Sequence, residues 1–181
     1  MTFHERAILR KSLRQLRRQL SGREQDDAAV ALYNTLAGQR FLRSAKRLAF
    51  YLANDGEIDP SLLLAVCLTR GQQCFLPLMH PFSRNRLLFV RYRKGDSLHS
   101  NRWGIQEPRL DARRLVPART LDVVMVPLVG FDAQRNRLGM GKGFYDTTFS
   151  FRAMTARRKP LLVGLAHECQ RVEALEKALA A

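Results

Sequence analysis

The residues best suited to chemistry lie in one glycine-rich segment of the chain. It reads Arg137-Leu138-Gly139-Met140-Gly141-Lys142-Gly143-Phe144-Tyr145-Asp146. Three glycines at alternate positions allow backbone N–H groups to turn into one concavity, and a helix that begins next adds its free donors and the positive end of its dipole. Lys142 and Arg137 supply mobile and planar positive charge for phosphoryl oxygens. Asp146, one helical turn further on, is placed to hold Mg²⁺ against the same phosphates.

The match to known phosphate-binding loops is partial. Gly143 stands where Ser or Thr follows the lysine of a Walker A motif, and the third glycine of the dinucleotide fingerprint would fall one residue later. The competing interpretation is a tight connection in which Lys142 is a solvated surface charge. The spacing by itself indicates an anion site and does not name the anion.

Strand-like and helix-like patterns alternate around this loop. Short apolar runs predict strands at residues 47–52, 73–78, 87–92, 121–129 and 161–166. The fourth strand leads directly into the glycine loop. The alternation predicts one domain over residues 1–181, with three α/β/α layers and a mostly parallel, mixed sheet, in which ligands bind at the carboxyl ends of the strands.

Two helices are expected at the N-terminus, at residues 4–20 and 21–38, and to pair as a helical hairpin. Ser21 and Glu24 form a capping-box pattern at the start of the second helix. Further helices are expected at residues 59–71, from residue 144 onward and at residues 172–179. The Arg- and Pro-rich stretch 94–119 is expected to be a long irregular connection over the active face.

The first helix carries much of the positive charge. The chain of 181 residues has a net charge of +15, and residues 1–47 hold eleven Lys and Arg against four acids. Its leucines recur at helical spacing, at Leu9, Leu13, Leu16 and Leu20. The cations on the remaining helix surface are Arg6, Arg10, Lys11, Arg14, Arg17 and Arg18. Such a surface attracts polyanions in general and does not choose among them.

The composition excludes several classes of protein. No apolar run is long enough to span a bilayer, and the N-terminus lacks the pattern of a secretory signal. The three cysteines fit neither a disulfide framework nor a metal or redox pair. We therefore expect a cytoplasmic protein with reduced thiols and no membrane partner. No specific nucleic-acid partner is expected, because the basic residues lack interleaved aromatics for base stacking and no nucleic-acid motif is present. The sequence does not determine the oligomeric state, for which a monomer is the expectation.

Residues 127–146, which end in the glycine loop, closely resemble the signature of the 5-formyltetrahydrofolate cyclo-ligase family, also called 5,10-methenyltetrahydrofolate synthetases. Further matching segments lie at residues 10–14, 52–59, 76–77, 103–108 and 163–166. The resemblance implies a ligase that uses ATP and Mg²⁺ to convert 5-formyltetrahydrofolate to 5,10-methenyltetrahydrofolate. In that reaction the formyl oxygen is phosphorylated and N10 closes the ring as phosphate leaves, which needs positioning and charge neutralisation rather than a protein nucleophile.

The resemblance also implies a role for individual residues. Lys142 and Arg137 act on the transferring phosphoryl group, and Asp146 is a metal ligand. The residues that the resemblance assigns to ATP binding are Arg10, Lys11, Arg14, Arg137, Leu138, Gly139, Met140, Gly141, Lys142, Gly143, Phe144 and Tyr145. The residues that it assigns to folate binding are Leu52, Glu57, Trp103, Met140, Gly141, Lys142, Gly143 and Phe144. Trp103 has two possible roles at this point: it packs in the hydrophobic core, or it stacks on the folate. Arg17 and Arg18 lie outside the matched motif and are expected to play no part in ATP binding.

One departure from the family concerns the C-terminus. Family members continue past the segment matching Gln170-Arg171-Val172 into an Asp and a last strand, and this Asp is a second metal contact. Here residues 173–181 contain no Asp. Two rival hypotheses stay open: a nucleic-acid-binding protein whose basic helix tracks phosphates, and a degenerate relative that binds folate or nucleotide without turnover.

Overall fold

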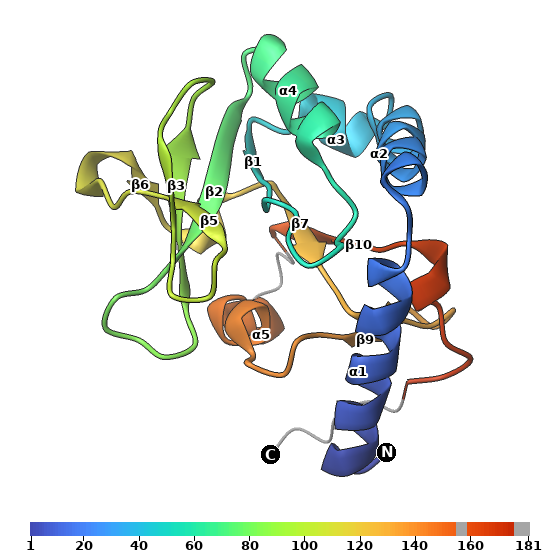
Figure 1. Ribbon diagram of the computed structural model, residues 1–181. Helices are drawn as coiled ribbons and strands as arrows, with labels where there is room; N and C mark the ends of the chain where they lie inside the picture. Colours follow the sequence, from blue (N-terminus) through green and yellow to red (C-terminus); the bar gives the residue numbers. More distant parts are fainter. Residues whose placement is uncertain (155–158, 176–181) are drawn as a thin grey trace.

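The computed structural model describes residues 1–154 and 159–175, and at its centre lies a six-stranded sheet (Figure 1). The strand order is β10-β7-β1-β2-β3-β6. The first four of these strands run parallel, and β3 and β6 add an antiparallel edge, so the mostly parallel, mixed sheet is confirmed. The strands of the central sheet are β1 Arg47–Ala49, β2 Gln73–Met79, β3 Leu87–Tyr92, β6 Leu115–Val116, β7 Val123–Pro127 and β10 Leu161–Leu165.

Helices cover both faces of this sheet, which makes the three predicted layers. The α-helices are α1 Phe3–Arg18, α2 Gly22–Leu36, α3 Arg40–Ser44, α4 Ser61–Thr69 and α5 Phe144–Thr148. The 3-10 helices are η1 Ala112–Arg114, η2 Ala118–Thr120, η3 Ser150–Met154 and η4 Glu168–Gln170. Of these, α2, α3 and α4 lie on one side of the sheet, and α5 and η3 pack on the other (Figure 1). None of the helices within the described residues is long and apolar enough to cross a membrane.

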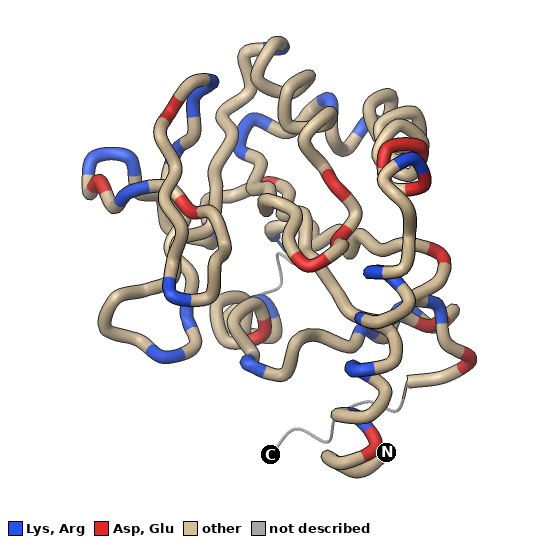
Figure 2. Tube along the Cα trace, in the orientation of Figure 1, with Lys and Arg blue, Asp and Glu red and all other residues tan. Residues whose placement is uncertain are grey.

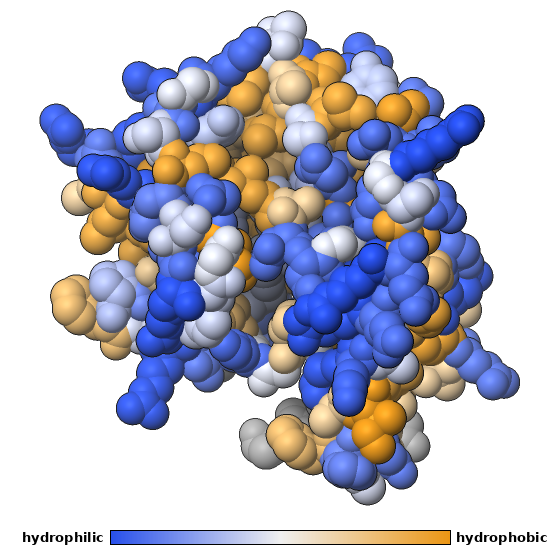
Figure 3. Space-filling model, in the orientation of Figure 1, coloured by the Kyte–Doolittle hydropathy of each residue, from blue (hydrophilic) through white to orange (hydrophobic). Residues whose placement is uncertain are grey.

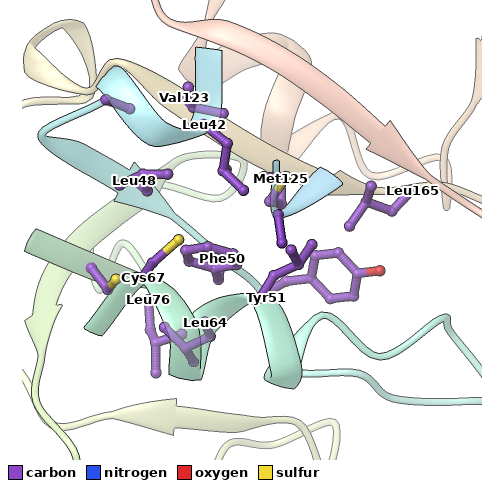
Figure 4. Close-up of a cluster of buried hydrophobic side chains, with 14 of the residues drawn as sticks. Leu42, Leu48, Phe50, Tyr51, Leu64, Cys67, Leu76, Val123, Met125 and Leu165 are labelled. Atoms are coloured by element: carbon purple, nitrogen blue, oxygen red, sulfur yellow. The ribbon is translucent and has the colours of Figure 1, made fainter. Parts of the chain in front are cut away.

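Alternation along the strands builds two hydrophobic cores. In β7, Val123 and Met125 join the cluster under α2, α3 and α4, whereas Val124 and Val126 face the cluster under α5. Successive side chains of a strand point to opposite faces, so a strand with both faces covered reads as a continuous apolar run. Figure 4 shows the first cluster, where Phe50 and Leu64 lie among side chains from several elements.

The two N-terminal helices form as predicted but do not pair with each other. Thr2 and Ser21 cap α1 and α2 through capping boxes. Figure 1 shows α2 lying beyond the end of α1 rather than back along it. The helix α1 packs against η4, and α2 packs against α4. The prediction that the two helices pair with each other is therefore wrong, because α1 and α2 each bury their apolar face against a different part of the domain.

Three local predictions also need correction. Residues 94–119 contain a hairpin of β4 Leu98–Ser100 and β5 Gln106–Pro108, where an irregular connection was expected. The glycine loop is preceded by a second short pair, β8 Gly130–Phe131 and β9 Arg137–Leu138, that the patterns did not indicate. Residues 172–175 are not helical, and the rest of the predicted C-terminal helix lies outside the described residues.

Candidate active site

A cavity of about 950 Å³ opens at the carboxyl ends of the parallel strands. Leu52 follows β1, Met79 ends β2 and Pro127 ends β7, and all three line the cavity. This is the edge at which open α/β sheets bind ligands. The volume lies at the upper end of the range of roughly 300–1,000 Å³ typical of small-molecule sites. Figure 3 shows this face of the molecule hollowed, with hydrophilic surface along α1.

The glycine loop forms one wall of the cavity. Gly141 and Gly143 adopt positive φ angles of 89° and 66°, in the left-handed region that favours glycine. A Cβ at Gly141 would lie 3.3 Å from the Cζ of Arg10, so a side chain there would press on the guanidinium. Arg10 Nε in turn donates to the carbonyl oxygen of Gly139 at 2.8 Å. The helix that follows, α5, has only five residues, and the bond from Arg10 ties the loop to α1.

One face of α1 forms a second wall. Arg6, Arg10, Arg14 and Arg17 line the cavity. Lys11 is exposed and is not part of the lining, so the structure does not bring it to the site. The physical reason is that successive helical residues are separated by about 100°, which places positions 10, 14 and 17 on one face and position 11 on another.

The close approach of a leucine side chain of α1 accounts for the glycine at the start of β8. A Cβ built on Gly130 would lie 2.6 Å from Leu13 Cδ1, closer than atoms pack. Leu13, Val129 and Leu138 form a small buried cluster beneath the loop. The leucine stripe of α1 thus fixes the helix against the strand that carries the glycine loop, although Leu16 of that stripe is 45% exposed.

Arg17 is the most unexpected residue of the site. Its side chain is 1% exposed, and its Nε and Nη2 donate to the carbonyl oxygen and the carboxylate of Asp55 at 2.8 and 3.0 Å. Arg14 Nε donates to the same carboxylate at 2.8 Å, and Arg18 makes a further short contact. Figure 2 shows the acidic turn after β1 beside the basic helix. The expectation that Arg17 is a surface residue is wrong, and its helical spacing from Arg10 was the signal that could have shown it.

Glu57 lies on the same turn as Asp55 and faces the cavity. Burial raises the pKa of Glu57 to about 7, and the Arg17 guanidinium, 3.7 Å away, opposes the rise. The Asn54 N–H donates to the Glu57 carboxylate at 3.2 Å. A carboxyl group with a pKa near neutrality can both accept and donate hydrogen bonds at physiological pH.

The β4–β5 hairpin carries Trp103 to the mouth of the cavity, so Trp103 is not a core aromatic. The residue is 37% exposed, and its ring meets Phe144 edge-on at 6.3 Å between ring centres. Lys142 Nζ lies 4.0 Å from the centre of the same ring. The hairpin therefore closes one end of the cavity against the glycine loop.

The last acidic group of the loop, Asp146, is 71% exposed and forms an ion pair with Arg137. Within residues 1–154 and 159–175 no group of three or more His, Cys, Asp or Glu side chains could hold a metal ion. At the place where the resemblance implied an Asp, the described part of this chain runs from Glu173 to Leu175, and the Leu175 N–H donates to the buried carboxylate of Asp132 at 2.8 Å.

The cavity gathers the residues that the sequence implied, apart from Lys11. Those that line it are Arg10, Arg14, Leu52, Glu57, Trp103 and residues 137–146. Their individual roles stay predictions. Arg6, Arg17 and Asp55 line the same cavity and were not assigned to it.

Comparisons with known proteins identify the family of the chain. The model of the 5-formyltetrahydrofolate cyclo-ligase family matches residues 3–176. A 5-formyltetrahydrofolate cyclo-ligase of Haemophilus influenzae is 35% identical over 97% of this chain and 92% of its own length. The Escherichia coli K12 protein of the same name is 39% identical over 90% of this chain and 88% of its own length.

Solved structures point the same way. The 5,10-methenyltetrahydrofolate synthetase of Aquifex aeolicus superposes with a TM-score of 0.80 at 28% identity, covering 97% of this chain and 84% of that one. A synthetase from Mycoplasma pneumoniae, at 22% identity and a TM-score of 0.71, supports the fold alone. The resemblance seen in the sequence is confirmed: the chain belongs to the 5-formyltetrahydrofolate cyclo-ligase family and is an enzyme of the ligase class.

Proposed function

We propose that the enzyme uses ATP and Mg²⁺ to convert 5-formyltetrahydrofolate to 5,10-methenyltetrahydrofolate, with release of ADP and phosphate. One observation carries the proposal: one cavity of about 950 Å³ is lined by the glycine loop, by the arginine face of α1, and by Glu57 and Trp103. Phosphoryl transfer between two bound substrates requires that both lie in one site.

In the proposed reaction the formyl oxygen attacks the γ-phosphorus, and the bond from that phosphorus to the β-phosphate oxygen breaks. N10 then attacks the formyl carbon, and the phosphorylated oxygen leaves as inorganic phosphate. The protein's part is to align the reactants and to neutralise charge on the transferring group. Lys142 and Arg137 are the cations of the loop, and Arg10 and Arg14 add charge from α1.

The folate would lie against Leu52, Glu57 and Trp103. Glu57 is the acid of this part of the cavity with a pKa near 7, which suits hydrogen bonds with the N–H groups of a pterin. Leu52 and Trp103 offer apolar contact for the ring system. The residues from Met140 to Phe144 line the same cavity, and we assign them to contact with both substrates.

The residues present fit Mg²⁺ as an ion brought with the nucleotide. Mg²⁺ is usually held by one or two carboxylates together with substrate phosphates, and Asp146 is an exposed carboxylate beside the loop. Asp55 is paired with three arginines and its side chain is 15% exposed, whereas Asp146 is paired with Arg137 and is 71% exposed, so Asp146 is the group we assign. When bound, the ion supplies neutralisation of phosphate charge.

The test is the absorbance of the methenyl product. We expect product only when ATP and Mg²⁺ are both present, and none after addition of a chelator. Turnover without ATP would refute the mechanism. Binding of nucleotide and folate without product would instead identify a degenerate binder.

The nucleic-acid alternative has lost the feature on which it rested. Arg10, Arg14 and Arg17 line the cavity, and Arg17 is buried against Asp55, so these cations do not form an exposed track for a phosphate backbone. Tight binding of single-stranded RNA with a steep salt dependence, in the absence of ATP-dependent turnover, would restore it.

A further inference from the structure

The ammonium group of Lys142 does not extend freely into the cavity. Its Nζ lies 4.0 Å from the centre of the Trp103 ring, within the distance of a cation–π contact. We propose that Trp103 is a positioning residue for Lys142: the indole face holds the ammonium while the phosphate site is empty and releases it when a triphosphate binds. This inference rests on the proposed function, because it assumes that the incoming anion is the nucleotide.

The hairpin that presents the indole is fastened by its own hydrogen bonds. Asn101 Oδ1 accepts from the backbone N–H groups of Trp103 and Ile105 at 2.9 and 3.1 Å. Asn101 Nδ2 donates to Glu107, which is 8% exposed. These bonds fix the tip between β4 and β5, so the indole has a defined place opposite the loop.

The glycine loop meets the indole from the other side. Phe144, two residues after Lys142, contacts the Trp103 ring edge-on at 6.3 Å. Gly141 and Gly143 have no side chains that could support the lysine stem, and both have positive φ angles. The contact with Trp103 therefore supplies order that the loop backbone does not, and it restricts the rotamers of a side chain that is otherwise flexible.

The contact between Lys142 and Trp103 is weak enough for a bound phosphate to displace it. A cation–π contact at a partly exposed ring is weaker than a charge-assisted hydrogen bond to phosphate. A phosphate group within reach of Lys142 would thus draw the ammonium away from the ring. An ion pair with a carboxylate in the same place would compete with the phosphate more strongly.

The chain offers a matched control in Arg102. Its Cζ lies 4.0 Å from the centre of the same ring, but Arg102 does not line the cavity. Both cations perturb one indole, and only Lys142 is placed to reach a bound nucleotide. Trp103 is the single tryptophan of the sequence, so tryptophan emission reports on the surroundings of this one ring.

The experiment measures the emission of Trp103 in the wild type, Lys142→Met and Arg102→Met proteins, with nucleotide binding followed in parallel by calorimetry. Without ligand, we expect both variants to differ from wild type. A non-hydrolysable ATP analogue with Mg²⁺ should shift the wild-type and Arg102→Met emission and leave that of Lys142→Met unchanged. An equal shift in all three proteins, or calorimetric binding without any shift, would overturn the inference while leaving the proposed function intact. Absence of nucleotide binding and of turnover would overturn both.

Kinetics separate this role from simple stacking on the folate. Trp103→Leu should lower kcat by up to about tenfold, because Lys142 is then no longer ordered beforehand and the rotamer entropy of one lysine must be lost during the reaction. Trp103→Phe should recover most of it because the aromatic face is retained. A raised KM for the folate with unchanged kcat would show that Trp103 only binds the pterin and would refute the positioning role.

Discussion

Replacing Arg17 by methionine tests the buried charge at the centre of the site. Methionine retains an unbranched stem but removes the guanidinium that donates to the Asp55 carboxylate at 3.0 Å and lies 3.7 Å from Glu57. Arg17 is 1% exposed, and the side chains of Asp55 and Glu57 are each 15% exposed. Water can therefore replace little of what the guanidinium provides.

The expected cost follows from what is left unpaired. Removing one partner of a buried ion pair typically costs about 3–5 kcal/mol. Asp55 keeps Arg14 and Arg18 as partners, and Glu57, with a pKa of about 7, can take up a proton. We therefore expect the lower end, about 3 kcal/mol, which for a chain of this length is a fall in Tm of roughly 6–12 °C.

Urea unfolding of Arg17→Met and Arg18→Met provides the measurement. Arg18 contacts the same carboxylate, but its side chain is 53% exposed, so its loss should cost no more than about 1 kcal/mol. The midpoint should move in the first variant far more than in the second, with similar dependence on urea. Equal midpoints would show that the buried guanidinium contributes no more than a surface charge and would refute the reasoning.

Three further predictions concern the chemistry. Lys142→Met should lower kcat about 10²-fold or more, measured as methenyl absorbance, and an unchanged kcat would make the lysine a surface residue. Because burial raises the pKa of Glu57 from 4.5 to about 7, folded protein binds more protons than unfolded protein between these values. The stability of wild type relative to Glu57→Gln should therefore fall as pH rises through this window, by at most about 1.4 kcal/mol per unit; parallel pH curves in denaturant titrations would contradict this. Arg14→Ala should raise the KM for ATP about tenfold, the value of a charge-assisted hydrogen bond, whereas Lys11→Ala, at an exposed position outside the cavity, should match wild type. Equal effects of the two would mean that the helix acts only through a diffuse field.

Much of the architecture was readable from local patterns. Residues 87–92 were predicted and found as a strand with the same bounds, and residues 73–78 differ from β2 by one residue. Strands covered on both faces must be apolar throughout, which makes them visible in sequence. The glycine loop was equally visible, since it needs positive φ angles at Gly141 and Gly143 that other residues rarely adopt.

Other features depended on segments that meet only in the folded chain. The sequence alone determined the fold class, the glycine loop and the family, because strand periodicity, glycine spacing and motif are local properties. Only the tertiary structure decided that Arg17 is buried, since its partner Asp55 lies 38 positions away. It likewise decided that Trp103 meets Lys142, because the β4–β5 hairpin folds over a loop distant in sequence. The charge of a basic helix face can be read from the sequence. Which of its cations are buried depends on the acidic side chains that the rest of the chain places beside them.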